Sequence, residues 1–597
     1  MAGVPVVIAG DEALVGKFSG NQRIAQGHQR GLNRIAAAFV AWLLAQPFVA
    51  SAADPAPQAP SGAIPRIEQL RASNPAPKDN SAALPDQPAT PKELGKPADD
   101  ILVDVASYAV NDSASSALKT ALPGLTAPFV GKQRSYEDLV NAASTVTRFM
   151  QRELGYYLAY AYLPAQAPAD GVIKIEVLDG RLDEVIVKWP ENLPVKHEVI
   201  EGYLSKLKSG DILRVRDVER VVFLINDLYG IRVRFEVKSG RTPGTASLVV
   251  TPQAETRLTG RVDLDMNGSR YSGVGRISGV AAWASPLNRG DSLTASGLVT
   301  ITGGLKFALV NYSTPVGSDG LKLGASVSSV QYQLDKHIIA SNFHGEATAL
   351  GAYALYPVIR SRNLNTFTSA TLESKDYSDV QQLVPRNSRT QDLQLGLVGD
   401  FRDNWLTGGV NTYELSWMHG HLSLQNGLLT VPANFNKYGL GYSRLQNLIS
   451  GRLMAYVRYK GQVAGNNLDN TERMSLGGPS GIRAYAPGEG TADSAHVLTT
   501  ELRWLPPESL FGRSAREMVF SAFYDLGMAK VQQHPASSAD STLDNSPTLG
   551  GAGLGFVWER PSLFAVRMSL AWPTQGVSVN DKQPRSPRMY ATFSKNL

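Results

Sequence analysis

From residue 256 to residue 597, apolar and polar positions alternate with a period of two in segments of about ten to fifteen residues, separated by Gly, Asn, Asp and Pro turns. In the segment 519–531, Phe523, Asp525 and Gly527 share one face, and the opposite face is almost entirely apolar. About sixteen such segments follow one another. An even number of strands with one polar and one apolar face predicts a closed antiparallel transmembrane barrel, because closure leaves no strand edge unpaired in lipid.

A helical period appears only before this region. Residues 101–180 and residues 181–253 each contain, in the same order, a strand, two amphipathic helices and two more strands. The chain therefore carries a tandem β-α-α-β-β module. We expect two α+β domains over these ranges, followed by the barrel over residues 256–597. A soluble β-sandwich would show the same alternation in the last region, but the strand count favours the barrel.

The first hundred residues predict targeting and a linker. Residues 35–45 form a short apolar stretch that follows two arginines and ends in small residues, which is typical of a cleaved export signal over residues 1–52. The part before this stretch is long for an n-region, so the signal is either extended or preceded by a start-site error. Residues 53–100 are rich in Pro and Ala and predict a linker, within which residues 64–73 could form a short helix.

Composition narrows the function classes. The 597 residues are 43% hydrophobic and 19% charged, which is the balance of a folded chain. The chain has no cysteine, so an exported form must be stabilised by packing and strand pairing. Without residues 1–52, which hold four basic and two acidic residues, the formal net charge of +5 falls to about +3. This weak balance, with no basic stripe, gives no support for a nucleic-acid partner.

A long loop interrupts the strand pattern. Residues 466–493 are rich in Gly and Pro and exceed an ordinary hairpin connection, and such length usually indicates function or disorder. Arg483 in this loop needs a carboxylate if it lies away from water, and Asp525 on the inner face of the next strand but one is the partner we predict. Phe523 could offer it an apolar wall, and Gly527 could leave room for the guanidinium. The alternative is a solvent-exposed turn with an ordinary surface arginine.

Four motifs in the right order carry a resemblance to a known family. The motif LGGPSGIRAY at 476–485 is similar to a loop motif, and FYDLG at 523–527 is similar to a strand motif, of the two-partner secretion transporters. Residues 162–182 and 219–233 resemble parts of the two POTRA domains of that family. The chain thus resembles the TpsB (ShlB/FhaC/HecB-like) family, within the BamA-like superfamily of POTRA barrels, over residues 101–597.

The resemblance implies a domain plan and a set of site residues. Residues 101–180 would be POTRA 1 and residues 181–253 POTRA 2. The helix at 64–73 would be a plug of the pore, the alternative being a short linker helix without that role. Ala484 departs from the family, which usually has Gly there. The resemblance implies that one group of residues anchors, gates or shapes an inward loop: Arg483, Asp525, Phe523, Gly527, Leu476, Gly477, Gly478 and Tyr485.

The resemblance also implies a function. It predicts an outer-membrane transporter that binds one dedicated TpsA-type exoprotein, such as an adhesin or haemolysin, through periplasmic POTRA domains. The client would then pass unfolded through the barrel without ATP. Further partners would be outer-membrane lipid and, during biogenesis, the barrel-assembly machinery. An insertase of the same superfamily and a passive porin are the alternatives, although insertases commonly carry more POTRA units and a porin needs none.

Catalysis and metal binding have little support. The GDSL sequence at 290–293 spells a hydrolase motif, but no Asp-x-x-His pair follows it near the C-terminus. His419 and His421 would share a strand face, yet no third metal ligand is apparent nearby. We therefore expect no catalytic residue, no metal and no cofactor.

Overall fold

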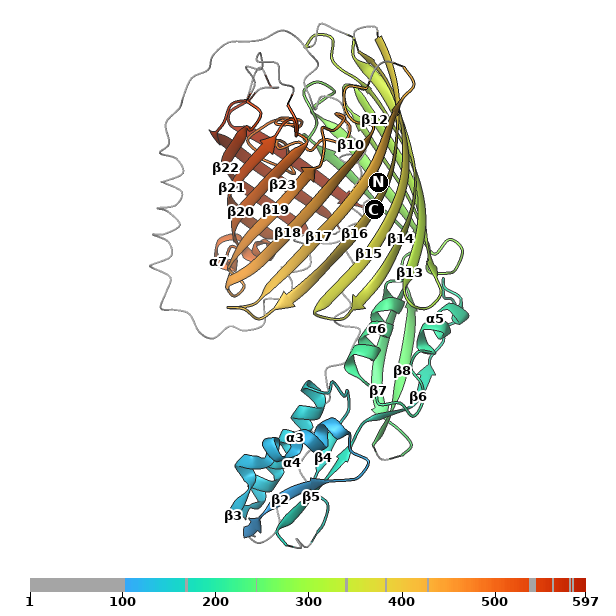
Figure 1. Cartoon of the computed structure of the whole chain (residues 1–597), viewed down its shortest axis with the longest axis vertical. Coiled ribbons are helices and arrows are strands. Elements are labelled where there is room, and N and C mark those ends of the chain that lie inside the picture. Colours follow the sequence, from blue (N-terminus) through green and yellow to red (C-terminus); the bar gives the residue numbers. More distant parts are fainter. Residues whose placement is uncertain are drawn as a thin grey trace.

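The computed structural model describes an elongated protein in which two small α+β modules lie below a β-barrel (Figure 1). The predicted export signal (1–52), linker (53–100) and helix (64–73) lie outside the described residues. The described residues are 102–597 except 167–169, 243, 339–341, 382–383, 427–428, 536–543, 561–562, 579–580 and 582–584.

The first module contains five strands and two α-helices. Two helices pack on a three-stranded sheet of order β2-β5-β4, and β1 and β3 form a separate antiparallel pair. The elements are β1 (Leu102–Val105), β2 (Ser107–Val110), α3 (Ser116–Thr126), β3 (Gly131–Ser135), α4 (Tyr136–Arg152), β4 (Tyr160–Tyr162) and β5 (Val172–Leu178). The sequence pattern did not predict β3, because its five residues, GKQRS, carry no apolar alternation.

Local sequence explains why α4 begins where it does. Ser135 accepts a hydrogen bond from the amide of Asp138, and the Asp138 side chain accepts one from the amide of Ser135. This capping box satisfies two amide groups that have no partner within the helix. The apolar face of α4, including Val146 and Met150, is buried against the sheet.

The second module repeats the plan with a simpler sheet of order β6-β8-β7. Its core is built on α6, whose residues Val222 and Ile225 are fully buried. The elements are β6 (Arg181–Val187), α5 (His197–Leu204), α6 (Val215–Asn226), β7 (Ile231–Ser239) and β8 (Thr245–Ala254).

No helix among the residues that the structure describes is long and apolar enough to cross a membrane.

The remaining strands form one closed antiparallel barrel of 16 strands, β9 to β24, in which each strand pairs with its neighbours in the chain and β24 pairs with β9. The predicted strand count is therefore confirmed. The strands are β9 (Leu258–Asp265), β10 (Arg276–Ala284), β11 (Ser292–Thr300), β12 (Leu305–Val316), β13 (Leu321–Gln333), β14 (His344–Arg360), β15 (Leu364–Gln381), β16 (Val384–Asp403), β17 (Gly409–Leu424), β18 (Asn434–Ile449), β19 (Leu453–Ala464), β20 (Ser494–Trp504), β21 (Met518–Lys530), β22 (Thr548–Arg560), β23 (Phe564–Gln575) and β24 (Arg588–Asn596).

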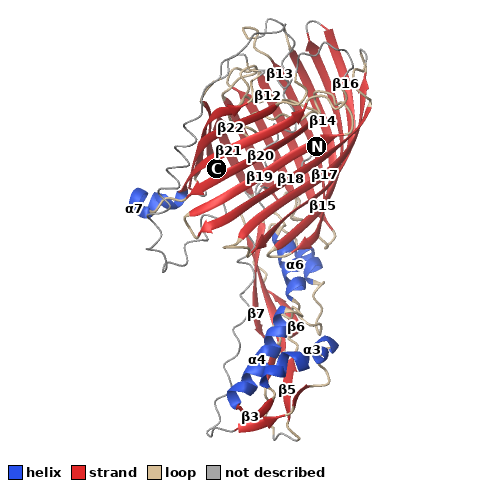
Figure 2. Cartoon of the chain, turned by 60° about the vertical axis from the view of Figure 1, so that its left-hand side comes forward, coloured by secondary structure: helices blue, strands red, loops and turns tan. Residues whose placement is uncertain are grey.

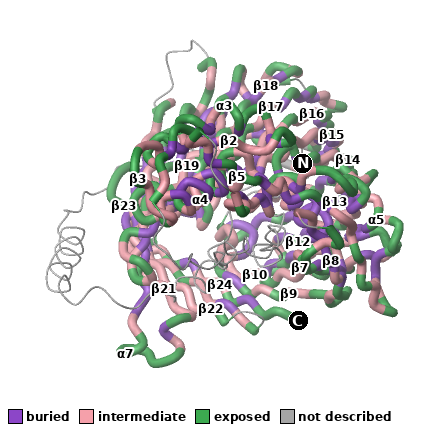
Figure 3. The backbone as a smooth tube through the Cα atoms, turned by 90° about the horizontal axis from the view of Figure 1, so that it is seen from below, coloured by how far each residue is buried: buried purple, intermediate pink, exposed green. Residues whose placement is uncertain are grey.

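The two faces of the barrel wall differ as the alternation predicts. On β21, Phe523, Asp525 and Gly527 are buried and Met528 is exposed. Figure 3 shows buried, intermediate and exposed positions intermingled around the ring of strands, and along β13 exposed and buried residues alternate one by one from Ala325 to Gln333. Large apolar side chains that face outward would be costly in water and suit lipid. They include Leu264, Val327, Leu350, Leu372, Leu440 and Phe593.

The second module is fastened to one end of the barrel, where α6 lies beneath the strands (Figure 2). Arg360 at the end of β14 pairs with Asp227, the residue that follows α6, at 2.7 Å. The amide of Tyr229 donates to the carbonyl of Gly290 in the β10–β11 turn at 3.1 Å. These contacts place the second module directly below the barrel turns.

Candidate functional site: the loop inside the barrel

The loop between β19 and β20 folds back against the inner wall of the barrel. Its residues Leu476 and Ile482 are fully buried. They belong to one apolar cluster with Val497 of β20 and Phe523 of β21, which lie on the inner face of the wall. The loop is held in shape by a short antiparallel bridge between Met474 and Ala492. The long connection is thus a packed part of the lumen, not a solvent-exposed turn.

Arg483 lies at the tip of the loop and contacts Asp525 in two ways. Its Nε and Nη2 atoms donate to the two carboxylate oxygens of Asp525, both at 2.9 Å, and its main-chain amide donates to Oδ2 at 3.1 Å. The Asp525 side chain is fully buried. A planar guanidinium that meets a carboxylate with two parallel bonds gives both strength and a fixed orientation. Backbone and side chain of Arg483 are therefore fixed together.

Two further groups complete the surroundings of the guanidinium. Nη1 of Arg483 donates to Glu501 of β20 at 2.6 Å, and Arg503 donates to the other oxygen of Glu501 at 2.9 Å. The Arg483 Cζ atom lies 3.3 Å from the ring centroid of Phe523. Sequence reasoning missed Glu501, although its position on the strand next to β21, on the inner face that it shares with Thr499, could have suggested it.

The glycines of the site make room for the loop backbone and its apolar side chains. A Cβ atom at Gly527 would lie 2.5 Å from Ile482 Cδ1. The prediction that Gly527 leaves room for the guanidinium is therefore wrong, since the space that it leaves is filled by Ile482. A Cβ atom at Gly477 would lie 2.4 Å from the carbonyl oxygen of Ala486, and Gly478 has a φ of +119°, which favours glycine.

Ala484, where the family usually has Gly, fits because of a second glycine. A Cβ atom at Gly551 of β22 would lie 2.5 Å from the Ala484 Cβ. The methyl group of Ala484 thus occupies the space that is left because Gly551 has no side chain. The Gly-rich sequence around Gly551 serves close packing against the loop, a function that the sequence alone did not reveal.

Tyr485 connects the tip of the loop to the last two strands of the barrel, β23 and β24. Its hydroxyl donates to the carbonyls of Gln575 at 2.7 Å and Gly576 at 3.0 Å, and its own carbonyl accepts from the Tyr590 hydroxyl at 2.8 Å. Burial raises the pKa of Tyr485 to about 12, so the hydroxyl keeps the proton that it donates. The structure brings all eight predicted loop and strand residues into this one network.

Other motifs have structural explanations. Asp291 of the GDSL sequence is fully buried and accepts hydrogen bonds from the amides of Leu287 and Arg289 within the β10–β11 turn. Nδ1 of His419 is hydrogen bonded to Asn436 at 3.1 Å. Across residues 102–597, apart from the gaps given above, no group of three or more His, Cys, Asp or Glu side chains could hold a metal ion.

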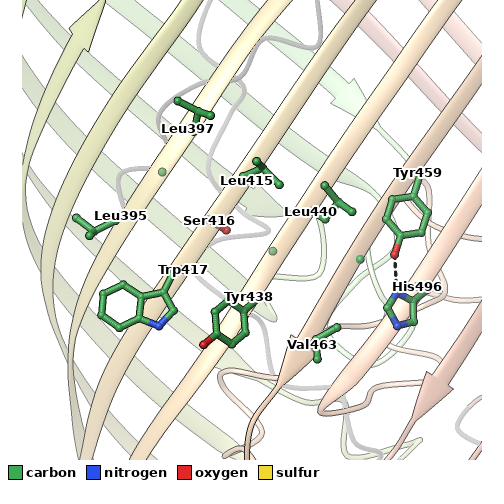
Figure 4. A pocket seen from close by; sticks show the side chains of 13 residues that line it. Leu395, Leu397, Leu415, Ser416, Trp417, Tyr438, Leu440, Tyr459, Val463 and His496 are labelled. Atoms are coloured by element: carbon green, nitrogen blue, oxygen red, sulfur yellow. Dashed lines mark hydrogen bonds between the residues drawn. The ribbon is translucent and has the colours of Figure 1, made fainter. Parts of the chain in front are cut away.

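A hollow of about 540 Å³ lies across strands β16 to β20 (Figure 4). It is lined mainly by apolar side chains such as Leu395, Leu415 and Leu440, which are 44–47% exposed and belong to the outward-facing set. Tyr459 and His496 form a hydrogen bond of 2.7 Å at one side. Because these groups face away from the lumen, the hollow belongs to the lipid-facing wall.

The comparisons with known proteins decide the family. The profile described as haemolysin secretion/activation protein ShlB/FhaC/HecB matches residues 244–557, and the profile of the ShlB-type POTRA domain matches residues 108–180. The chain belongs to the ShlB/FhaC/HecB family. Members of this two-partner secretion family are outer-membrane transporters, and this chain is one: a barrel in the outer membrane with POTRA domains in the periplasm.

Individual relatives agree with this assignment. The heme/hemopexin transporter protein HuxB of Haemophilus influenzae (strain 86-028NP) is 26% identical over 74% of this chain and 79% of its own length. The solved structure of CdiB from Escherichia coli matches with a TM-score of 0.64 and 20% identity, over 85% of this chain and 92% of that chain. BamA from Haemophilus ducreyi, without its POTRA domains 1–3, shares the fold with a TM-score of 0.52 and 12% identity, over 83% of this chain and all of that chain.

Proposed function

We propose that this transporter secretes one dedicated exoprotein, which it receives unfolded in the periplasm and passes through its own barrel without ATP. The observation that carries the proposal is the loop held inside the lumen by Arg483 and Asp525. Two parallel hydrogen bonds to one carboxylate hold the tip of the loop at a defined place inside the lumen, so the loop shapes the path that a passing polypeptide would follow. The proposed chemistry is binding and movement, and no residue is assigned to a bond-making step.

The modules below the barrel supply a surface for an extended client. In the second module, β7 lies at an edge of the sheet and pairs only with β8 among the described strands. Its outward positions, such as Arg232 and Arg234, are exposed. An extended polypeptide can add to such an edge through main-chain hydrogen bonds, which makes recognition independent of most of the client sequence. We assign initial client capture to edges of this kind.

We propose two further partners. The apolar outward wall is suited to outer-membrane lipid, and the family fold, which BamA shares, suits insertion by the barrel-assembly machinery. Both are proposals for this chain.

The test is secretion of a candidate client from cells that express the wild type, Arg483→Ala or Arg458→Ala at equal abundance in the outer membrane. Removing Arg483 strands the fully buried Asp525, and breaking such a pair from one side costs about 3–5 kcal/mol. Arg458 is the matched control, because it also donates to the loop, at 2.7 Å to the Ser480 carbonyl, but through one exposed hydrogen bond.

We expect the wild type and Arg458→Ala to secrete the client and Arg483→Ala to retain it in the periplasm. Normal secretion by Arg483→Ala would refute the role of the loop and leave the transporter assignment standing. Equal export in cells that lack the protein would refute the assignment of that client.

A further inference from the structure

The loop has a second attachment, on a different part of the wall. Glu472, which precedes the tip, accepts from Lys375 Nζ of β15 at 2.9 Å and from Lys437 Nζ of β18 at 2.7 Å. Gln462 of β19 donates to the Glu472 carbonyl at 3.2 Å. The Glu472 side chain is 1% exposed. We call residues 469–473 the arm of the loop and residues 476–485 its tip.

The wall that receives the arm holds more charges. Lys375 Nζ also lies 3.2 Å from Asp392 of β16 and 4.0 Å from Glu373 of its own strand. The side chains of these three residues are at most 2% exposed. The arm carries two more ion pairs: Asp469 pairs with Arg386 of β16, whose side chain is 30% exposed, and Arg473 pairs at 2.8 Å with Asp493, the last residue of the loop itself. The far attachment is therefore a buried ionic cluster.

The two attachments lie on opposite sides of the barrel. Glu472 is bound to β15, and the Tyr485 hydroxyl is bound to the last residue of β23, Gln575. In the closed order of 16 strands, β15 and β23 are eight strands apart in either direction. The arm and the tip together therefore bridge the lumen from one side to the other.

The charge left behind differs between the two walls. If the tip detached, Asp525 and Glu501 would remain with Arg503 alone, which is an excess of one negative charge in a buried place. If the arm detached, Lys375 would keep Asp392 and Glu373, and Lys437 would lose its contact with Glu472. These two lysines and two carboxylates sum to no net charge, and the released Arg386 is partly exposed to water. An uncompensated buried charge is expensive, whereas a balanced set can persist.

We propose that the arm is the releasable part of the loop and that the tip stays fixed: Glu472 leaves Lys375 and Lys437 to widen the lumen while Arg483 remains on Asp525. The proposal rests on the proposed function, since it names the step that admits the client. It assigns Glu472, Lys375 and Lys437 as positioning residues of the transport path.

The absence of cysteine allows a direct test in the purified full chain without any client. The thiol of L468C reports the arm, since Leu468 is 1% exposed and packs against Phe435. The thiol of A484C reports the tip, since Ala484 is 4% exposed. Each reporter is combined with Glu472→Gln, and labelling by a water-soluble maleimide is followed over time.

We expect Glu472→Gln to speed labelling of the L468C thiol at least tenfold, which corresponds to about 1.4 kcal/mol, and to leave labelling of the A484C thiol within twofold. Lys437→Met should act in the same direction. Arg444→Met is the matched control, because Arg444 lies on the same strand as Lys437 and pairs with Asp403 at 2.6 Å, with no contact to the loop. It should leave both rates unchanged.

Equal acceleration at both thiols would mean that the loop moves as one body, and unchanged labelling in both Glu472→Gln and Lys437→Met would mean that the cluster does not hold the arm. Either result overturns the proposal. Because neither measurement involves a client, the outcome is independent of the secretion test of Arg483.

A reversible lock provides the second test, in secreting cells. In R386C/D469C the arm is linked to β16 by a short bis-methanethiosulfonate. In A484C/G551C the tip is linked to β22 by a disulfide. The two Cβ atoms would start 2.5 Å apart, so the loop must shift slightly away from β22 to reach the Cβ–Cβ distance of about 3.8 Å in a disulfide. We expect the arm lock to abolish secretion until a reductant is added and the tip lock to permit it. Secretion through a locked arm would refute the proposal.

Discussion

The joint between the second module and the barrel should depend on one arginine. Arg360 donates to both carboxylate oxygens of Asp227, at 2.7 and 2.8 Å, and to Asn365 Oδ1 at 2.7 Å. Its side chain is 7% exposed. Asp227 is the C-terminal cap of α6, where the helix dipole disfavours a negative charge, so the cation of the barrel compensates the helix end as well. The perturbation that we consider is Arg360→Met, which keeps most of the apolar stem.

The free-energy cost of Arg360→Met depends on the contacts that Asp227 keeps after the arginine is removed. Removing one partner of a buried ion pair typically costs about 3–5 kcal/mol. The Asp227 side chain is 17% exposed and Lys322 Nζ still donates to the Asp227 main-chain oxygen at 2.8 Å, so the lower end, about 3 kcal/mol, applies. At 1.4 kcal/mol for each factor of ten, the joint should open about a hundred times more often.

Hydrogen exchange at two amides measures this opening. The amide of Tyr229 is bonded to Gly290, and that of Lys196 to Asn288 at 2.9 Å, so both are protected by the joint itself. Arg232→Met is the control, since Arg232 pairs with Glu255 while 51% exposed and should change exchange by less than about threefold. If both amides in Arg360→Met exchange within threefold of the wild type, the ion pair does not hold the joint.

Three further changes test the packing of the site and of the modules. Gly527→Val should displace the loop, because its Cβ would lie 2.5 Å from Ile482, and the conductance of the purified barrel in a planar bilayer should rise. Tyr485→Phe removes the donor to two carbonyls and should weaken docking of the tip by about 1 kcal/mol, seen as faster proteolysis of the loop. Ile225→Ala, in a fully buried position, should cost about 2–5 kcal/mol of protection in hydrogen exchange of the second module, whereas Ile186→Ala, at 40% exposure, should cost less than about 0.5 kcal/mol.

The fold could be predicted largely from the sequence because its pattern is repetitive. Alternation along each strand follows directly from the barrel geometry, and the helical period of α4 and α6 follows from one buried face. The strand β3 was missed, and residues 102–110 form two strands where one was expected, because the amides of Ala106 and Ser107 both turn toward the carbonyl of Gly171. Such hydrogen bonds join segments that are far apart in the chain, and they produce no periodic pattern of apolar residues in the sequence.

The site could be predicted only where charge limits the choice. A buried arginine needs a carboxylate, which made Asp525 a reasonable prediction for the partner of Arg483. The structure gives Arg483 a second carboxylate, Glu501, to which only its inner-face position points, and gives Glu472 two lysines that no local pattern indicates. Both depend on which inner-face residues lie close once the barrel closes. The same dependence explains the wrong expectation for Gly527, since the identity of its neighbour is a matter of three-dimensional packing.

The joint between the second module and the barrel and the joint between the loop and the barrel wall both use buried ion pairs. The cores of the modules and the strand ladder of the barrel are stabilised differently. The modules are stabilised by apolar cores and the barrel by its strand ladder, both of which must be lost as a whole. The second module meets the barrel through Arg360 and Asp227, and the loop meets the wall through Arg483 and Glu472 as well as through the apolar cluster of its tip, so both joints contain buried ion pairs. An ion pair is costly to break when one partner stays buried, but it costs much less when the departing and remaining groups are hydrated or balanced by neighbours. The free energy needed to separate a joint is therefore lowest where the charged groups that stay behind have no net charge. Among these joints, that condition is met at the wall that binds Glu472.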